Sequence, residues 1–461
     1  MSLEVYPSKA KTRKYFIAAV LLFVLQMILG LLMSIQMVSR DTNLLFPFDI
    51  YKALHLNLMI LWILLGFIGG LYYLLPGEVG RDINHPWLID FQFWFLMLSG
   101  IGIIISEFFF TGMNWWLVEG REYVEAGRFW DILLTAGLLT VVYNVGATVL
   151  GRKREMSSPM IVLAWGAVGS ILMYVPGEIW FNSLVAAEYF RWWVVHYWVE
   201  ATFELIAAGV TALVLLSMTN VRRAIIEKYL AIEVALILLT GIIGQGHHYF
   251  WIGTPGFWLF LGGIFSALEP VPLFLMVWSA YKDLRENKKP IPNKVALYMI
   301  IGAALGNVLG AGVWGFMHTL PQVNFFTHGT QITASHAHFA TPGTYLLLVL
   351  GIAYIAVPEL AGKFSFSQYR GRIGFWILVL GFMNMIIALV IAGIIQVYQQ
   401  RMQGVSFMAV QNMLLPFYGW RMIGGVIALA GGIIVAYDLI VLGQSKMNTG
   451  NFIDETKEVK R

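Results

Sequence analysis

Long apolar runs separated by short polar segments repeat along the whole chain. Each run has about the 20 residues that an α-helix needs to cross a bilayer. The pattern predicts spans over residues 15–37, 52–75, 90–111, 129–150, 160–182, 191–217, 229–252, 257–281, 294–317, 331–357, 372–397 and 419–443. We therefore expect an all-α integral membrane protein, with about twelve transmembrane helices in a single membrane domain over residues 1–461.

Composition and charge support this fold class. Hydrophobic residues make up 59% of the chain and charged residues 12%, far from the values of soluble domains. The first apolar run lacks a small-residue cleavage site, so we interpret it as a retained helix and not as a signal peptide. Basic clusters such as 152–154 and 288–289 fall on the same side as the N-terminus. The positive-inside rule then places both termini in the cytoplasm. We expect the protein to lie in a bacterial or archaeal cytoplasmic membrane. Its surroundings would be lipid, and it would not bind nucleic acid.

The chain contains no cysteine, which limits the metal chemistry that it can support. Disulfides, thiolate-bound zinc, iron–sulfur clusters and a covalently attached c-type haem are excluded. Histidines and carboxylates must hold any metal. Of nine histidines, six lie inside expected spans at a similar depth near the outer face: His55, His196, His247, His248, His336 and His338. Scattered core histidines, each satisfied by a neighbour, are the alternative. Burying six imidazoles at one depth is costly, however, unless they bind partners such as metals.

Helix geometry sorts these histidines into sites. Positions 336 and 338 are two apart, so on a helix they point about 200° away from each other. They cannot bind one metal, but they can serve two cofactors on opposite sides of the helix. His247 and His248 are about 100° apart and can converge on one metal where the helix ends before Gly253.

The stretch W-W-V-V-H-Y-W-V-E at 192–200 adds a carboxylate to the imidazoles. On a helix, His196, Glu200 and Glu204 share one face, a turn apart. His196 and Glu200 could complete the site of the adjacent histidine pair, which leaves His55 as a partner for one cofactor of the 331–357 span. The pattern indicates a low-spin haem, a second haem with an open coordination position, and a non-haem metal, for which a carboxylate favours iron over copper(I).

Several stretches resemble the haem–copper oxidase superfamily, and within it the large subunit of the cytochrome c-dependent nitric oxide reductases. They are W-W-V-V-H-Y-W-V-E, H-L-N-L at 55–58, G-R-E-Y-V-E at 120–125, G-H-H-Y-F-W-I-G at 246–253, S-A-L-E-P at 266–270, G-A-G-V-W-G-F at 310–316 and T-H-G-T-Q-I-T-A-S-H-A-H at 327–338. The likeness runs over nearly all of the chain.

The resemblance implies a role for each of the six histidines. His196, His247 and His248 would bind a non-haem iron, with Glu200 as its carboxylate ligand. His336 would be the proximal ligand of a high-spin haem b, and His338 with His55 would hold a low-spin haem b.

The resemblance also assigns carboxylates and a reaction. Glu200, Glu204 and Glu269 match acids near the active site, and Glu269 stands in mid-span before Pro270, where an unpaired acid is expensive. Glu122 would bind a calcium that bridges the haem propionates, and Glu125 would lie at the mouth of a proton path from the outer face. Two NO molecules would become N2O and water with two electrons and two protons, as in denitrification. A membrane-anchored cytochrome c subunit on the outer face would donate the electrons.

Two alternatives stay open at this point. Many oxygen-reducing members of the superfamily carry a tyrosine four residues after the first non-haem ligand, where this chain has Glu200. The chain also departs from the reductases at Ala340, Thr341 and Pro342, where a more aromatic sequence is expected. A twelve-helix transporter with a polar core is the alternative from another class, although inverted repeats, which would favour it, are not evident.

Overall fold

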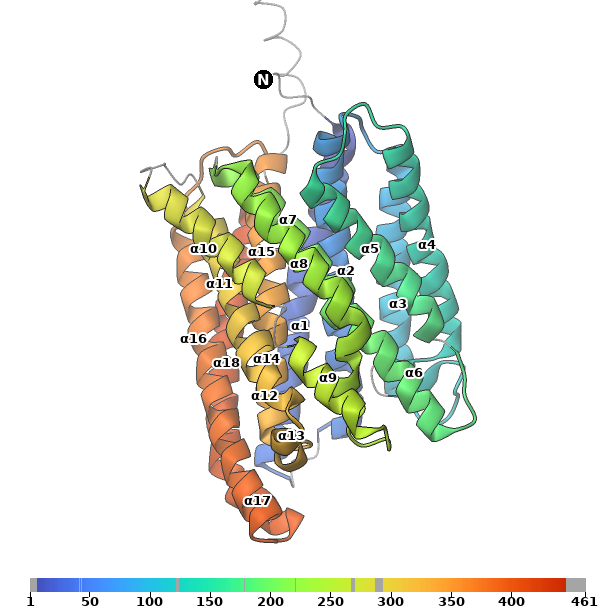
Figure 1. Ribbon diagram of the computed structural model, residues 1–461, viewed down its shortest axis with the longest axis vertical. Coiled ribbons are helices and arrows are strands. Elements are labelled where there is room, and N and C mark those ends of the chain that lie inside the picture. Colours follow the sequence, from blue (N-terminus) through green and yellow to red (C-terminus); the bar gives the residue numbers. More distant parts are fainter. Residues whose placement is uncertain are drawn as a thin grey trace, which may run out of the picture.

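A computed structural model describes residues 6–444, except 41, 43, 122–123, 178, 220, 267–269 and 287–292. Its helices run side by side in one bundle (Figure 1). In the first half these are η1 (Pro7–Thr12), α1 (Arg13–Val38), α2 (Phe48–Val79), α3 (Pro86–Phe110), α4 (Arg128–Leu150), α5 (Ser158–Gly177), α6 (Leu184–Tyr197), η2 (Trp198–Thr202) and α7 (Phe203–Thr219). Strands β1 (Val118–Arg121) and β2 (Val124–Ala126) form an antiparallel hairpin between α3 and α4.

In the second half, all the regular elements of the described residues are helices. It comprises α8 (Arg223–Ile243), η3 (Gly244–His248), α9 (Gly256–Ser266), α10 (Pro270–Glu286), α11 (Lys294–Gly306), η4 (Asn307–Trp314), α12 (Gly315–Thr319), α13 (Pro321–Thr327), α14 (Gln331–Thr341), η5 (Pro342–Leu346), α15 (Leu347–Leu360), α16 (Tyr369–Gln396), η6 (Val397–Met402), α17 (Phe407–Met413) and α18 (Leu415–Gly443). The segments η1 and η3 are 3₁₀-helices, and η2, η4, η5 and η6 are π-helices.

Eleven helices of the described residues are long and apolar enough to cross a membrane. They correspond to all of the expected spans except the one at 229–252. The chain does form a helix there, α8, which packs against α7 and α10. In α8, which ends at Ile243, the charged residues Glu227, Lys228 and Glu233 interrupt the apolar run. The predicted all-α membrane fold is thus confirmed, with one span less apolar than expected.

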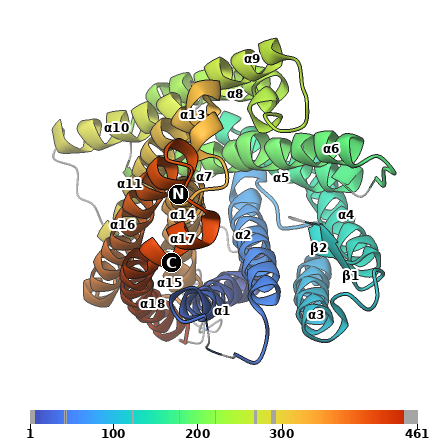
Figure 2. The same ribbon diagram turned by 90° about the horizontal axis from the view of Figure 1, so that it is seen from below.

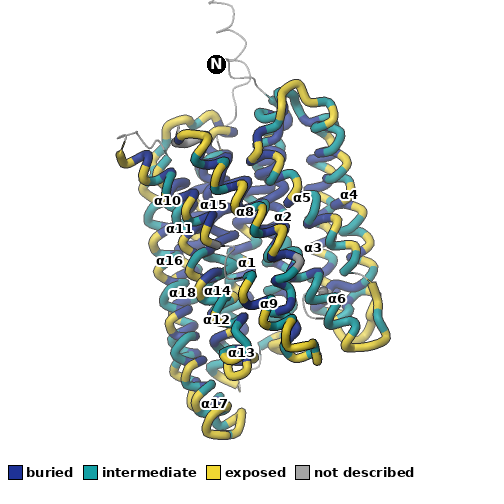
Figure 3. The backbone as a smooth tube through the Cα atoms, in the orientation of Figure 1, coloured by how far each residue is buried: buried dark blue, intermediate teal, exposed yellow. Residues whose placement is uncertain are grey.

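The spans that carry histidines are the most enclosed. The most apolar part of the span Leu184–Leu216 is 78% buried, and Phe48–Val79 and Gln331–Leu360 reach 72%, whereas α4 and α5 reach 33%. An end-on view places α2, α7 and α14 around the middle of the bundle, with α3, α4, α10 and α16 outside them (Figure 2). Buried residues lie inward and exposed ones outward along the same helices (Figure 3). Because large apolar side chains such as Leu98, Trp165 and Leu380 are exposed on the outside, this surface suits lipid.

Small residues allow the most extensive helix–helix contact among the described residues, between α16 and α18. A Cβ added to Gly381 would lie 2.2 Å from the backbone nitrogen of Ala428, and one added to Gly424 would lie 2.6 Å from that of Met385. The two backbones can therefore approach only without side chains at these points, as is common between helices in membranes.

Candidate metal centre

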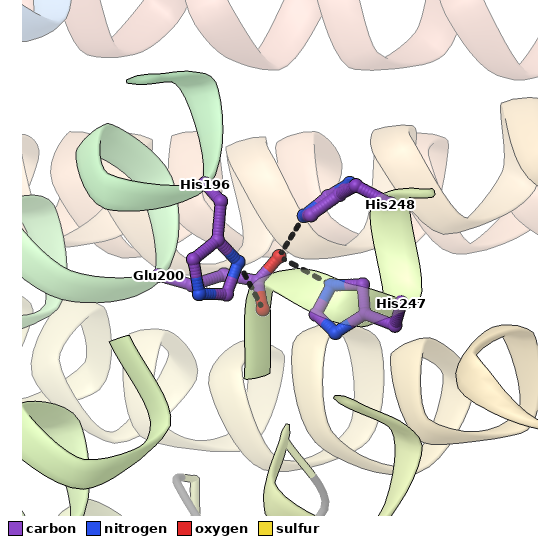
Figure 4. A group of neighbouring side chains, drawn as sticks. All are labelled: His196, Glu200, His247 and His248. Atoms are coloured by element: carbon purple, nitrogen blue, oxygen red, sulfur yellow. Dashed lines mark hydrogen bonds and ion pairs between the residues drawn. The ribbon is translucent and has the colours of Figure 1, made fainter. Parts of the chain in front are cut away.

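Three imidazoles and one carboxylate meet between α6–η2 and η3 (Figure 4). Glu200 is the centre of the group. Its Oε1 lies 3.1 Å from Nε2 of His247 and 3.0 Å from Nε2 of His248, and its Oε2 lies 3.5 Å from Nδ1 of His196. The four residues predicted to share a site are therefore neighbours, although 47 residues separate Glu200 from His247 in the chain.

This donor set fits a metal ion. One ligand atom from each residue lies within 4.8 Å of the others. An ion bonded at about 2.0–2.2 Å in a tetrahedral site holds its ligands roughly 3.3–3.6 Å apart, so small side-chain shifts suffice. Nδ1 of the fully buried His196 has no hydrogen-bond partner and faces the group, as an unused metal ligand would. Glu200 and His248 keep 22% and 19% of their side-chain surface accessible, so the group is not sealed on every side.

Departures from the α-helix bring these side chains together. The π turn η2 contains Glu200 and follows directly on the turn that carries His196. Single π turns inside α-helices are frequent at functional sites, because they change the direction of the side chains around them. On the other chain segment, α8 tightens into the 3₁₀ turn η3, which carries His247 and His248 as its last two residues. Gly244 permits this approach, since a Cβ there would lie 2.9 Å from Ser266 Oγ and 3.4 Å from the His196 ring.

Neighbouring groups fix how each imidazole is presented. The Ser266 hydroxyl lies 2.8 Å from Nδ1 of His247, which leaves Nε2 of that ring for the cluster. His196 directs Nε2 to the carbonyl of Thr240 at 3.4 Å, so its Nδ1 is the atom that faces Glu200. The Trp192 ring stacks on His248 with a 10° interplanar angle. Such outer contacts orient metal ligands and set their tautomers.

A second pair, His55 and His338, faces across a separate gap. Their ring centroids are 6.4 Å apart. Two imidazoles that share one metal through bonds of about 2 Å would have ring centroids no more than roughly 6 Å apart, so His55 and His338 would together be able to hold one. Nδ1 of His55 hydrogen-bonds to the carbonyl of Gln26 (2.9 Å) and Nδ1 of His338 to that of Ala334 (2.8 Å), which leaves both Nε2 atoms available to bind a metal.

A buried cation accompanies this pair. Arg421, on α18, is 8% exposed and interacts electrostatically with His55 and His338. Its Nε has no hydrogen-bond partner, its Nη1 contacts Met37 Sδ at 3.1 Å, and no carboxylate of the described residues forms an ion pair with it. An unpaired buried guanidinium is costly, and it suits an anionic group such as a haem propionate.

His336 points away from His338, although both lie on α14, which begins at the Thr330 cap. Its Nδ1 hydrogen-bonds to the carbonyl of Gly310 in the π-helix η4 at 3.0 Å, so Nε2 is again the available atom. His336 interacts electrostatically with Glu200 and His247. The His336 ring packs closely against Gly315, because a Cβ added to Gly315 would lie only 3.0 Å from the ring. His336 therefore serves a different space from His338, next to the carboxylate cluster.

Of the remaining carboxylates that the sequence indicated, only Glu204 has a side chain that the structure describes. Glu204 is buried, and its Oε2 has no hydrogen-bond partner. Glu269 and Glu122 lie outside the described residues, and so does the side chain of Glu125, whose backbone is in β2.

Sequence reasoning missed three groups around these sites. Arg421 and Glu233 are charged residues inside apolar runs, so the cost of burying a charge could have singled them out. Ser266 gives no such signal, because a serine in an apolar helix is common and only the tertiary contact with His247 reveals it.

The fold and the four-residue cluster define a class of membrane oxidoreductases. Residues 10–427 match the family described as Cytochrome C and Quinol oxidase polypeptide I, and the chain belongs to this family within the haem–copper oxidase superfamily.

Within the class, the chain is 38% identical over 450 residues to the B subunit of the nitric oxide reductase of Stutzerimonas stutzeri, and the match covers 94% of each protein. The predicted resemblance to nitric oxide reductases is thus confirmed. A cytochrome c oxidase subunit 1 homologue of Azorhizobium caulinodans is 25% identical over 77% of this chain and 66% of its own length. A haem–copper terminal oxidase solved as a dimer by cryo-EM shares the fold, with a TM-score of 0.73 at 12% identity, over 96% of this chain and 85% of the other.

Proposed function

We propose that this chain is the catalytic subunit of a nitric oxide reductase. It would join two NO molecules into N2O and water, with two electrons and two protons. The observation that carries the proposal is the position of Glu200, whose carboxylate contacts all three clustered histidines. A carboxylate among three imidazoles favours iron over copper(I), because hard oxygen ligands suit the harder ion.

The residues would hold three cofactors. His196, His247, His248 and Glu200 would hold a non-haem iron, His336 a high-spin haem b, and His55 with His338 a low-spin haem b. When bound, these groups would supply two neighbouring irons for NO and a route for electrons. The chain itself would orient each ligand through Ser266, Gly310 and Gln26, and would give negative charge to the iron site through Glu200.

Protons and electrons would enter from outside the cluster. Glu204 and Glu269 would handle protons near the iron, and Glu125 would lie at the entry of a path from the outer face. Glu122 would bind a calcium. Because the chain has no cysteine for a covalently held haem, a membrane-anchored cytochrome c subunit would deliver electrons at the outer face. Both termini would lie in the cytoplasm.

The test is cofactor analysis joined to gas turnover. The full chain, purified with its partner subunit, is expected to contain two b-type haems per non-haem iron, by pyridine haemochrome and elemental analysis. With a chemical electron donor it should consume NO and release N2O in a 2:1 ratio. An oxygen-reducing oxidase is the competing function, since a relative named as a cytochrome c oxidase subunit 1 homologue also matches, at lower identity. Copper in place of iron, or O2 turnover without NO turnover, would overturn the proposal.

A further inference from the structure

An apolar groove with a volume of about 580 Å³ lies on the outside of the bundle, where α11 is flanked by α10 and α16 (Figure 2). Aromatic side chains border it: Phe274, Trp278 and Tyr281 on α10, Tyr298 on α11, and Phe375 and Trp376 on α16. Four of the lining side chains are 43–53% exposed: Leu305, Leu309, Trp278 and Trp376. The groove is therefore open towards the lipid and is not an internal cavity.

Glycines bring α11 close to the segment behind it and so make room for the groove. A Cβ added to Gly306 would lie 2.2 Å from the carbonyl oxygen of Gly343 in η5, so the two backbones are in contact. A Cβ added to Gly302, which also lines the groove, would lie 2.8 Å from a methyl group of Leu347. Any side chain at these positions would push α11 outward and fill the space.

The length of the groove matches one leaflet of a bilayer. Along α11 and η4 its lining extends from Tyr298 to Leu309, which is about 16 Å at the rise of a helix. The hydrocarbon core of a bilayer is about 30 Å thick, so one leaflet supplies chains of about 15 Å. The far end of the groove reaches Phe339 and the histidine beside it, His338.

A basic residue lies one helical turn beyond a bordering aromatic residue on each of the three helices. The pairs are Tyr281 with Arg285 on α10, Tyr298 with Lys294 on α11, and Trp376 with Arg372 on α16. Residues four apart share one face of a helix. Since α10 ends and α11 and α16 begin at the end of the bundle where the N-terminus lies, all three cations are at that end (Figure 1). The rings of Tyr298 and Trp376 are 6.4 Å apart, which places Lys294 and Arg372 on neighbouring turns.

The protein itself supplies these three cations with no anion. None of them forms an ion pair with a carboxylate of the described residues, where Glu286 pairs with Lys282 and Asp438 with Arg370. Nε of Arg372 is buried and has no hydrogen-bond partner. Nη1 of Arg285 donates to the hydroxyl of Tyr281 at 3.2 Å, which holds its guanidinium beside the rim of the groove. Guanidinium groups at a membrane surface suit phosphate.

We propose that this groove binds one anionic phospholipid from the leaflet on the N-terminal side. Its phosphate would lie among Arg285, Lys294 and Arg372, and one acyl chain would fill the groove. A membrane helix of a partner subunit fits less well. Both termini are expected in the cytoplasm, where the positive-inside rule gives membrane helices basic ends, so a second helix would add positive charge beside the three cations. The proposal does not depend on the reaction that the chain catalyses.

The test is native mass spectrometry of the full chain with its cofactors and partner subunit, titrated with dioleoyl-phosphatidylglycerol or dioleoyl-phosphatidylcholine. One phosphatidylglycerol should stay bound at concentrations where phosphatidylcholine does not. Arg372→Gln should weaken the binding of phosphatidylglycerol about 5-fold, the effect of one cation near a membrane surface. Leu305→Trp should abolish it, because the indole fills the groove.

Each variant has a matched control that changes the same residue type outside the groove. Arg222→Gln removes an exposed cation before α8, and Leu380→Trp enlarges a side chain that is 60% exposed on α16 and does not line the groove. Both should bind phosphatidylglycerol as the wild type does. Unchanged haem spectra in all four variants would show that they fold.

Three results would overturn the proposal. The first is equal binding of the two lipids by the wild type. The second is a loss in Arg372→Gln and Leu305→Trp that is no larger than in their controls. The third is binding of phosphatidylglycerol by the isolated chain but not by the complex, which would assign the groove to the membrane helix of the partner subunit.

Discussion

Replacing Glu200 by Gln removes the negative charge of the cluster and almost none of its volume. The two shortest contacts of Glu200 are with His247 and His248, both at Oε1, and the third is with His196 at Oε2. The glutamine oxygen can still accept at the first position, but its amide nitrogen replaces the oxygen that faces His196. Loss of an outer hydrogen-bond partner of a metal ligand typically costs about 10–100-fold in metal affinity.

Because Glu200 would also be a direct ligand, we expect iron affinity to fall by at least this factor. The assay is iron per haem by elemental analysis after dialysis against a graded series of chelator concentrations. Both haems should stay bound, because neither of their expected ligand sets includes Glu200. NO turnover should fall in step with the iron. Glu204→Gln is the control, since it removes a buried acid that has no contact with the three histidines, and it should keep its iron. Full iron and full turnover in Glu200→Gln would refute the reasoning and leave Glu200 as a satisfied buried acid.

Three further outcomes follow from the ligand geometry. His338→Ala should remove the low-spin haem signal in optical and EPR spectra while the haem of His336 remains, and equal loss of both haems in folded protein would contradict separate ligation. Arg421→Gln should lower the midpoint potential of the low-spin haem in a redox titration, because a nearby positive charge favours the reduced form; an unchanged potential would separate Arg421 from the haem. Ser266→Ala should weaken iron binding about 10–100-fold by freeing the tautomer of His247, which the same chelator series would measure, and unaltered iron content would make that hydrogen bond incidental.

The membrane class, the spans and the grouping of the histidines can all be predicted from the sequence. These features depend on short-range rules: the length of apolar runs, and the angle between side chains a few residues apart on a helix. His336 and His338 point in opposite directions because they are two residues apart on a helix. In the structure His336 lies beside His318, and His338 lies beside His55. The expected span at 229–252 is the exception, because the helix formed there, α8, ends earlier, at Ile243, and begins earlier, so that it includes the charged residues Glu227 and Lys228.

Which distant groups meet depends on the packing of the helices and cannot be predicted in this way. The contact of Glu200 with His247 requires a π turn in one segment and a 3₁₀ turn in another, and neither departure has a reliable signal in a single sequence. The unpaired charge of Arg421 beside the histidine pair depends on contacts between helices that are separate in the chain. Apolar periodicity says which face of a helix turns inward, but it does not say which helix that face meets, because many partners satisfy the same pattern equally well.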